Sequence, residues 1–251
     1  MDLGLDGRTV IVTGASGGIG RHIARAFGAE GAHVVLTYRD SRHEADQAAK
    51  EIGDRALVVR YDMADADAPG ALVQAAQEWT GRVDVLVNNA VYWGDEAPQP
   101  DLPFEDVPDE AWLRVFRLNT EGALRLSRAV APRMRERRWG RIVHISSSIA
   151  TDGMAGGEYY GAAKAALHGF SRSSAFSLGA HGDILTNVVM PGLTRTDTNT
   201  HIVDAVGDQY SAVAPIGRLL DASEVAGPVV YLGSAANSGI TGQVISVTGG
   251  A

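Results

Sequence analysis

Short apolar runs alternate with amphipathic helical patterns along the chain. The runs are rich in Val, Ile and Leu, as in strands buried on both faces, and the patterns between them repeat with the helical period. Strands are expected at residues 8–14, 33–38, 55–62, 82–90, 140–147, 183–191 and 242–249. Helices are expected at residues 18–31, 42–53, about 69–79, 109–137, 157–179 and 222–234, and a less regular polar stretch at 192–218.

This alternation predicts the α/β class. Strands that alternate with helices form a parallel sheet covered on both faces, and right-handed crossovers make it doubly wound. No repeat, low-complexity tract or linker interrupts the pattern, so we expect one domain over residues 1–251. Ligands of such folds bind outside the carboxyl ends of the strands, where the unusual residue clusters of this chain are expected.

The stretch TGASGGIG, residues 13–20, joins the first expected strand to its helix. Gly14, Gly18 and Gly20 allow a tight turn and a close approach of the backbone to a ligand. The unpaired N–H groups and the dipole of the helix N-terminus favour an anion such as a pyrophosphate. The spacing G-x-x-x-G-x-G differs from the common G-x-G-x-x-G, so the turn indicates either a dinucleotide site or a structural connection.

The loop after the second strand, LTYRDS, carries the residues that would select the cofactor. Dinucleotide enzymes hold the ribose 2′-hydroxyl with an acid here, or a 2′-phosphate with an arginine nearby. Asp40 has the approximate spacing of the acid, but Arg39 comes first in the loop after Tyr38. We favour Arg39, and hence NADP(H) over NAD(H), with two solvated loop charges as the alternative.

Two later strand ends offer further polar groups. Asp62 closes the third strand and could accept a hydrogen bond from an adenine amino group or cap the next turn. Asn88 and Asn89 end the fourth strand. They could hold neighbouring backbone loops, touch the ribose or form an ordinary turn.

The helix expected at 157–179 carries two adjacent tyrosines and a lysine in the stretch GGEYYGAAK. Tyr160 and Lys164 are four residues apart and share a face, whereas Tyr159 points about 100° away. A nearby ammonium would lower the pKa of Tyr160, and such a phenol can donate a proton to a carbonyl oxygen or remove one from an alcohol. The alternative is a surface cation over an aromatic ring. Ser147, at a strand end, could hydrogen-bond the same oxygen or only form a turn.

The composition argues against several other kinds of function. The formal charge of −8 disfavours general binding to nucleic acid or anionic membranes. The chain has no cysteine, which excludes disulfides, thiol nucleophiles and zinc–thiolate sites, and its seven histidines form no metal-ligand spacing. Because we find no signal peptide and no apolar run long enough to span a membrane, we expect a cytoplasmic protein.

The motifs TGASGGIG, NNA, RLNTEG, ISSS, YGAAK, MPG and ITGQVISVTGG follow one another across the whole chain. In this order they resemble the short-chain dehydrogenase/reductases, in particular members similar to 3-oxoacyl-(acyl-carrier-protein) reductases. The resemblance implies a Rossmann-like fold with a seven-stranded parallel sheet. It also implies a homodimer or homotetramer that associates through the helices expected at 109–137 and 157–179.

The resemblance assigns a role to each residue of a catalytic set. Tyr160 would be the acid or base, and Lys164 would lower its pKa and hold the nicotinamide ribose. Ser147 would orient the substrate carbonyl, and Asn119 would hold a water in the proton relay. The cofactor-binding residues that it implies are Gly14, Ser16, Gly18, Ile19, Gly20, Arg39, Asp62, Met63, Asn89, Ala90, Tyr160, Lys164, Pro191, Gly192 and Thr194.

The chain departs from the family's pattern at several positions. Val91 stands where glycine usually follows NNA, and Thr248 lies in VTGG where VDGG is commoner. Gly17 stands where NADP-using members often carry a basic residue, which leaves Arg39 as the main support for NADP(H). Tyr38 stands where NAD-using members carry an acid, and this supports the same choice.

Two segments are expected to cover the substrate. The chain is longer than compact members between NNA and RLNTEG, and the extra segment at 91–108 brings Tyr92 and Trp93. Their apolar faces and polar tips suit the wall of a substrate pocket, with a subunit contact of Trp93 as the alternative. The segment at 193–212 is interpreted as a mobile lid that excludes water, with a rigid surface helix as the alternative.

We therefore expect an enzyme that uses NADPH to reduce a ketone, such as a 3-oxoacyl thioester, to a secondary alcohol. The basic cluster RMRERRWGR, residues 133–141, would dock an acidic carrier protein or is a solvated helix end. One alternative function is a dehydrogenase of a sugar, steroid or other secondary alcohol. Another is a catalytically silent binding or scaffold protein, since a fold alone does not prove activity.

Overall fold

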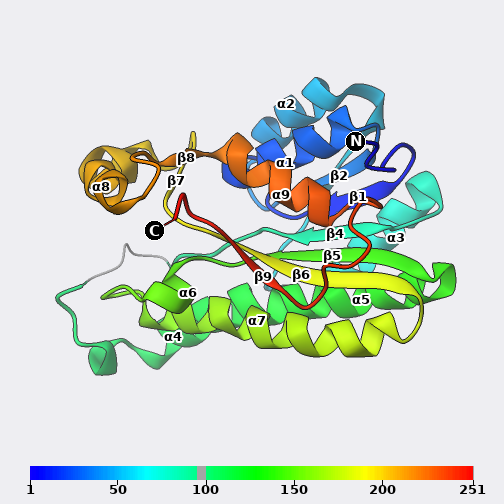
Figure 1. Cartoon of the computed structure of the whole chain (residues 1–251). Helices are drawn as coiled ribbons and strands as arrows, with labels where there is room; N and C mark the ends of the chain where they lie inside the picture. Colours follow the sequence, from blue (N-terminus) through cyan, green and yellow to red (C-terminus); the bar gives the residue numbers. More distant parts are fainter. Residues whose placement is uncertain (95–99, 251) are drawn as a thin grey trace.

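A seven-stranded parallel sheet forms the centre of the protein (Figure 1). The structure is a computed structural model, and it describes residues 1–94 and 100–250. In the interior strand Thr9–Val12, Val10 lies beside Val34 on one side and Val85 on the other. The strand order is β3 (Ala56–Arg60), β2 (His33–Tyr38), β1 (Thr9–Val12), β4 (Val85–Asn88), β5 (Trp139–Ile145), β6 (Asp183–Pro191) and β9 (Val244–Val247). The predicted Rossmann-like, doubly wound fold class is confirmed.

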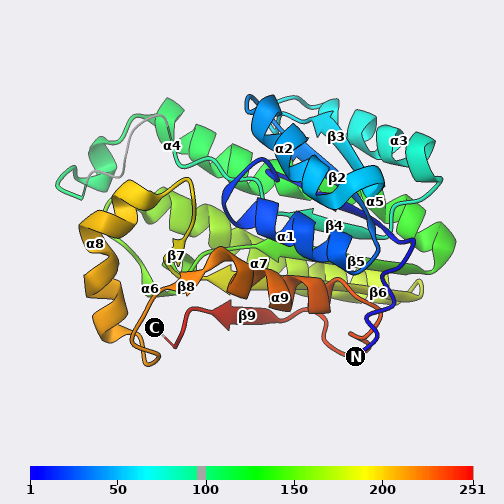
Figure 2. The same cartoon turned by 90° about the horizontal axis from the view of Figure 1, so that it is seen from above.

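Helices cover both faces of this sheet (Figures 1 and 2). One face carries α1 (Gly18–Ala29), α2 (Arg42–Ile52) and α9 (Ala222–Leu232), and the other carries α3 (Ala68–Thr80), α5 (Gly122–Arg137) and α7 (Glu158–Gly179). Phe27 of α1 lies in the core of the first face, and Leu126 of α5 lies in the core of the second. The β-branched and leucine residues of the strands fill both cores, which is why the strands read as continuous apolar runs.

Apart from η1 (Gly53–Arg55), which leads into β3, most of the remaining elements gather at the carboxyl ends of the strands (Figures 1 and 2). They are η2 (Phe104–Asp106), α4 (Asp109–Phe116), α6 (Ile149–Asp152), the small parallel ladder of β7 (Thr194–Arg195) and β8 (Leu220–Asp221), and α8 (Thr200–Val213). The less regular polar stretch expected at 192–218 therefore contains a helix. Residues 95–99 of the predicted 91–108 segment lie outside the described residues.

The helix expected at 109–137 is interrupted. A π-helical turn, η3 (Arg117–Glu121), separates α4 from α5 and carries Asn119. The Asn119 side chain donates from Nδ2 to the carbonyl of Val115 at 2.9 Å, four residues earlier. Asparagine side chains compete in this way with the helical backbone, and π turns occur frequently at functional sites. The sequence analysis did not predict this turn.

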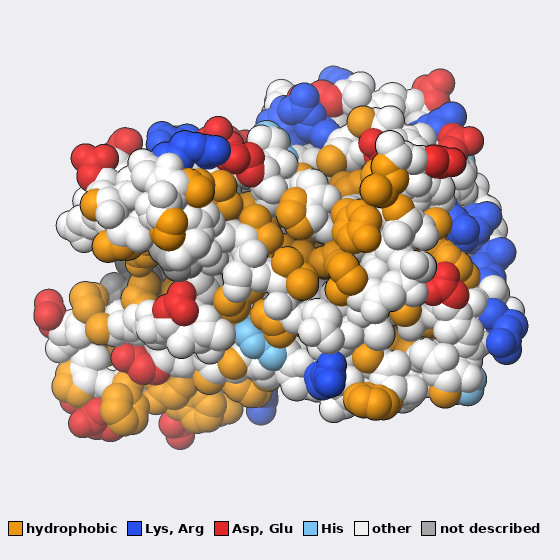
Figure 3. Space-filling model, viewed as in Figure 1, with side chains coloured by type: hydrophobic (Ala, Val, Ile, Leu, Met, Phe, Trp, Pro, Cys, Tyr) orange, Lys and Arg blue, Asp and Glu red, His pale blue; other side chains and the backbone are white. Residues whose placement is uncertain are grey.

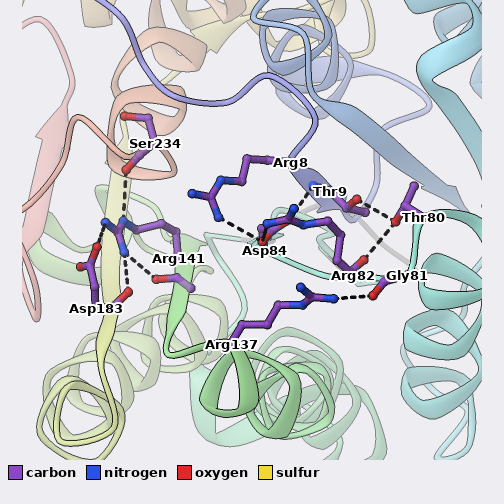
Figure 4. Close-up of polar contacts among 11 residues, drawn as sticks. Arg8, Thr9, Thr80, Gly81, Arg82, Asp84, Arg137, Arg141, Asp183 and Ser234 are labelled. Carbon is purple, nitrogen blue, oxygen red and sulfur yellow. Dashed lines mark hydrogen bonds and ion pairs between the residues drawn. The ribbon is translucent and has the colours of Figure 1, made fainter.

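The amino edge of the sheet holds a buried polar network (Figure 4). Arg141 is fully buried, and its guanidinium donates to the Ser234 and Asn237 carbonyls and to the carboxylate of Asp183 at 2.9–3.1 Å. The inclusion of Arg141 in a docking cluster at 133–141 was therefore wrong. The rest of that cluster spans the end of α5 and the first residues of β5, at the opposite edge of the sheet from the carboxyl ends of the strands.

Candidate active site

The glycine turn packs directly on the end of β4. Gly14 has φ +64°, and a Cβ there would lie 2.9 Å from the Ala90 Cα. A Cβ at Gly20 would overlap the carbonyl oxygen of Gly14. Side chains are thus excluded at both positions, as a cradle for a close-lying dinucleotide requires.

The N-terminus of α1 already holds an anion that belongs to the chain. The Gly18 N–H donates to Asp197 Oδ1 at 2.9 Å, and the Asp197 carboxylate lies 3.8 Å from the guanidinium of Arg21. Because a helix N-terminus favours negative charge, the carboxylate marks where a pyrophosphate would bind. The residues present therefore fit a dinucleotide. The sequence analysis missed Asp197, which lies in the segment interpreted as a lid.

The chain after β6 lies against the glycine turn. Pro191 ends β6, Gly192 follows it, and Thr194 is buried in β7. A Cβ at Gly17 would lie 3.1 Å from the Thr198 methyl group. A larger side chain at Gly17 would therefore require Thr198 to shift.

The two asparagines after β4 hold neighbouring segments together. Asn88 is buried, and its Nδ2 lies 3.1 Å from Ser127 Oγ and 3.2 Å from His144 Nδ1. Asn89 donates from Nδ2 to the carbonyls of Thr13 at 2.9 Å and Gly14 at 3.2 Å, so it clamps the glycine turn. The Asn89 side chain thus fixes a neighbouring loop, one of the alternatives that the sequence left open, whereas Asn88 joins α5 to β5.

Two arginines meet where β2 and β3 end. Arg39 donates from Nε to Asp40 Oδ2 at 2.5 Å, and this hydrogen bond raises the pKa of Arg39. Arg60, level with Tyr38 in the sheet, donates from Nε to the Arg39 carbonyl at 3.2 Å. The sequence analysis missed Arg60, although its place at the end of the third strand could have indicated it.

The other expected cofactor contacts lie around the same edge. Asp62 Oδ1 accepts from the backbone N–H of Ala64 at 2.9 Å, so this side chain caps a turn. Met63 packs against Gly122 at the start of α5. Ser16 lies in the glycine turn and Ile19 in the first turn of α1. Their contacts with a cofactor stay predictions.

Tyr160, Ser147 and Lys164 come together at the carboxyl end of β5. Tyr160 is buried near the start of α7, and its hydroxyl is hydrogen-bonded by Ser147. The Lys164 Nζ lies 5.7 Å from the centroid of the Tyr160 ring. It donates to the Ile145 carbonyl at 2.9 Å, which fixes the ammonium below the ring.

The pKa values of Tyr160 and Lys164 differ from those expected from the sequence. Burial raises the pKa of Tyr160 above its ordinary value, and the Ser147 hydrogen bond opposes this only in part. Burial also lowers the pKa of Lys164 to about 8. The expected lowering of the Tyr160 pKa by Lys164 was therefore wrong for this structure, because desolvation of the phenolate dominates. Tyr160 is held as a protonated phenol, the form that donates a proton.

Tyr159 takes a structural position instead. Its hydroxyl donates to the Phe104 carbonyl at 2.9 Å, and its ring stacks on Trp112 of α4 with centroids 5.1 Å apart. Tyr159 thereby fastens η2 and α4 to the start of α7. The helical period had predicted that the two tyrosines point in different directions, and they do.

Asn119 and Trp93 complete the surroundings of Tyr160. Asn119 bonds both backbone groups of Tyr92, with Nδ2 to the carbonyl oxygen at 2.6 Å and Oδ1 from the N–H at 3.1 Å. This clamp positions the next residue, Trp93, whose ring stacks on that of Tyr160 at a centroid distance of 4.0 Å and an interplanar angle of 17°. The relay water expected at Asn119 stays a prediction.

Comparison with known proteins identifies the class. The family model described as enoyl-(acyl carrier protein) reductase matches residues 14–251. The chain belongs to the short-chain dehydrogenase/reductase family, and it is an oxidoreductase acting on CH–OH or C=O groups.

Relatives of this chain carry different substrate names. It is 38% identical to the L-rhamnose 1-dehydrogenase (NAD(P)(+)) of Sphingomonas sp. (strain SKA58), over 98% of this chain and 96% of that one. It is 35% identical to the 3-oxoacyl-(acyl-carrier-protein) reductase of Escherichia coli (strain K12), over 99% and 98%. A solved glucose/ribitol dehydrogenase from Brucella melitensis superposes with a TM-score of 0.88 at 32% identity, over 100% and 98%. Within the described residues, no helix is long and apolar enough to cross a membrane.

Proposed function

We propose that the protein reduces a ketone to a secondary alcohol with NADPH, and that Tyr160 is the proton donor. The observation that carries the proposal is a buried phenol, bonded to Ser147 and placed over Lys164, beside a glycine cradle that fits a dinucleotide. Bound NADPH would supply the hydride. The side chains of the protein orient the substrate and transfer the proton.

The proton moves from Tyr160 to the substrate oxygen. Burial keeps the phenol protonated, so Oη can donate when negative charge develops on a carbonyl oxygen placed against it. Ser147 is placed to hydrogen-bond the same oxygen, as an oxyanion donor does. Lys164, anchored on the Ile145 carbonyl, stabilises the phenolate that remains and would hold the ribose of the cofactor.

The preference for NADP(H) rests on Arg39. Its guanidinium lies at the end of β2, where a 2′-phosphate would bind, and Arg60 brings a second one. Asp40 competes with the 2′-phosphate for Arg39. The preference for NADP(H) therefore requires that the ion pair between Arg39 and Asp40 breaks when the cofactor binds. Arginine suits this task because its planar fork binds phosphate through two parallel hydrogen bonds.

A secondary-alcohol dehydrogenase is the second candidate. The same residues work in reverse when Tyr160 accepts a proton from an alcohol, and one relative bears the name L-rhamnose 1-dehydrogenase. A 3-oxoacyl thioester on a carrier protein has weaker support, because the cluster at 133–141 lies where α5 ends and β5 begins, at the other edge of the sheet. A silent scaffold would have no need for a buried Tyr160.

We also infer that residues 1–251 form one domain, because strands from both parts of the chain share one sheet. The proposal includes a cytoplasmic homodimer or homotetramer that associates through α5 and α7. An exposed Phe176 on α7 supports this interface. Light scattering on the purified protein tests the assembly, and a monomer at micromolar concentration would contradict it.

The test of the reaction compares two neighbouring tyrosines. Tyr160→Phe should keep the fold and cofactor binding but lower turnover by about 10²-fold or more, the scale of general acid catalysis. Tyr159→Phe is the matched control, since its hydroxyl only ties η2 to α7. Full turnover by folded Tyr160→Phe would refute the assignment.

A further inference from the structure

We propose that the substrate of this site is a free ketone or alcohol that has a flat apolar body and carries no anionic group. Acyl groups attached to coenzyme A or to an acidic carrier protein are then disfavoured. This inference rests on the proposed function, because it concerns the mouth of the same site. Two independent observations support it, one from charge and one from exposed apolar surface.

The mouth lies between α8 and the lobe formed by α4 and α6. Figure 3 shows the molecule hollowed there, with hydrophobic side chains on both sides. Three segments surround the hollow: residues 100–110 before and at the start of α4, residues 149–160 from α6 to Tyr160, and α8. Their position is tied to the site through the stacking of Trp93 on Tyr160 and the bond from Tyr159 to Phe104.

These three segments are acidic without exception. None of the chain's 22 Lys and Arg residues lies in them. Their nine carboxylates are Asp101, Glu105, Asp106, Asp109, Glu110, Asp152, Glu158, Asp204 and Asp208. Clustered charges of one sign create a potential that repels ions of the same sign and slows their association. A substrate with phosphate groups or an acidic carrier would meet this field before it reached Tyr160.

Three arginines of neighbouring elements already have partners. Arg114, one turn into α4, lies over the Tyr92 ring with its Cζ 5.0 Å from the centroid. Arg195 pairs with Asp221 at 3.6 Å beside the small ladder. Arg21 lies on the cofactor side, between Glu51 and Asp197. Each of these guanidiniums thus already contacts an aromatic ring or a carboxylate.

Exposed apolar side chains belong to segments on both sides of the mouth. Before α4 they are Trp93, Leu102 and Phe104, with Phe104 57% exposed. On α8 they are Ile202, Tyr210 and Val213, with Val213 70% exposed. Exposed apolar side chains on both sides of a hollow are typical of a binding site for an apolar group.

The indole of Trp93 favours a substrate whose apolar group is flat. Its indole lies flat on the Tyr160 ring and is still 46% exposed, so part of it faces the mouth beside the proton donor. A substrate ring can stack on the indole while its carbonyl oxygen reaches Tyr160. Such aromatic pairs favour binding by about 0.5–1.5 kcal/mol beyond their buried area, which corresponds to roughly 2- to 10-fold.

The experiment presents one ketone on carriers of different charge. The acetoacetyl group is supplied as the neutral N-acetylcysteamine thioester and as the anionic coenzyme A thioester, and kcat/KM is measured at low and high salt. We expect the neutral thioester to be favoured about 10-fold or more at low salt, with a smaller difference at high salt. The Kd of both compounds is also measured on Tyr160→Phe loaded with NADPH, which binds them without turnover.

Two double variants test the origin of the effect. Asp101→Lys with Glu105→Lys should raise kcat/KM for the coenzyme A thioester several-fold at low salt. Glu30→Lys with Asp54→Lys makes the same charge change at the opposite edge of the sheet and should leave the ratio of the two substrates as it is. The apolar part is tested with ethyl benzoylacetate against ethyl acetoacetate, a preference that Trp93→Ala and Trp93→Leu should reduce.

The outcomes separate the two proposals. If the coenzyme A thioester binds and reacts as well as the neutral one at low salt, the inference is overturned while the proposed function stands. If no compound shows turnover that depends on Tyr160, the proposed function fails, and the order of Kd values still decides the inference. Equal preference for the benzoyl and acetyl esters in the unmodified protein would overturn the apolar part.

Discussion

Neutralising Asp197 should make the protein bind its cofactor more tightly. In the structure its carboxylate accepts the Gly18 N–H at 2.9 Å, at the N-terminus of α1. A pyrophosphate needs the same donors, so the carboxylate must leave when the cofactor binds. Asp197→Asn keeps an acceptor of the same shape and removes only the charge, which isolates the competition between the two anions.

The expected gain in cofactor affinity follows from the contacts that Asp197 makes in the cofactor-free protein and that the substitution weakens. A hydrogen bond to a charged group contributes about 1.5–3 kcal/mol, and an anion at a helix N-terminus about 0.3–1 kcal/mol. The Asp197 side chain is 51% exposed, so water and salt reduce both values. We therefore expect a gain of about 1–2 kcal/mol in cofactor binding, or roughly 5- to 30-fold in Kd. The cofactor-free variant should lose a similar amount of stability.

The assay is calorimetric titration of NADPH into the cofactor-free protein, with thermal unfolding of the free and saturated forms. The control is Asp204→Asn, which removes the same charge one helical turn into α8, away from the glycine turn. Asp197→Asn should lower the melting temperature only without cofactor, by about 2–4 °C for each kcal/mol. An unchanged or weaker affinity for NADPH in this variant would refute the competition.

Three further predictions concern the cofactor, the lysine and α8. Arg39→Ala should shrink the difference in affinity between NADPH and NADH by about 1.5–3 kcal/mol, measured by titration, and equal affinities in the unmodified protein would mean that Arg39 is a loop charge. Lys164 has a folded pKa of about 8, so between about pH 8 and 10 the unfolded state binds more protons. Denaturant unfolding of the cofactor-free protein should therefore show stability rising by about 2–3 kcal/mol over that range, and Lys164→Met should abolish the rise. Finally, α8 buries only Val203 and Gly207 and should exchange its amide hydrogens quickly without ligands and slowly with NADPH and a substrate analogue. Equal protection in both states would make it a rigid surface helix.

Local periodicity was enough for most of the fold and for the catalytic helix. The strands appear as apolar runs because parallel strands are buried on both faces, and this is visible in one stretch of chain at a time. Tyr160 and Lys164 share a face because four residues complete about one helical turn. The glycine turn is also visible in one stretch of chain, but the lack of space at Gly14 comes from Ala90, which follows a different strand.

Tertiary packing determined the long-range contacts of the site, which no local sequence pattern contains. Asp197 reaches Gly18 across 179 residues of sequence, and Trp93 stacks on Tyr160 from a different strand end. The pKa of Tyr160 depends on how completely its surroundings exclude water, so the sign expected from Lys164 alone was wrong.

Long-range contacts also separated residues that look alike in the sequence. Arg141 follows a run of exposed arginines but is buried against the Asp183 carboxylate and distant backbone carbonyls. The sequence determined which elements form and which side chains share their faces, because period and spacing are local. The folded chain alone determined which elements meet, and therefore which charges are desolvated and which side chains surround the substrate.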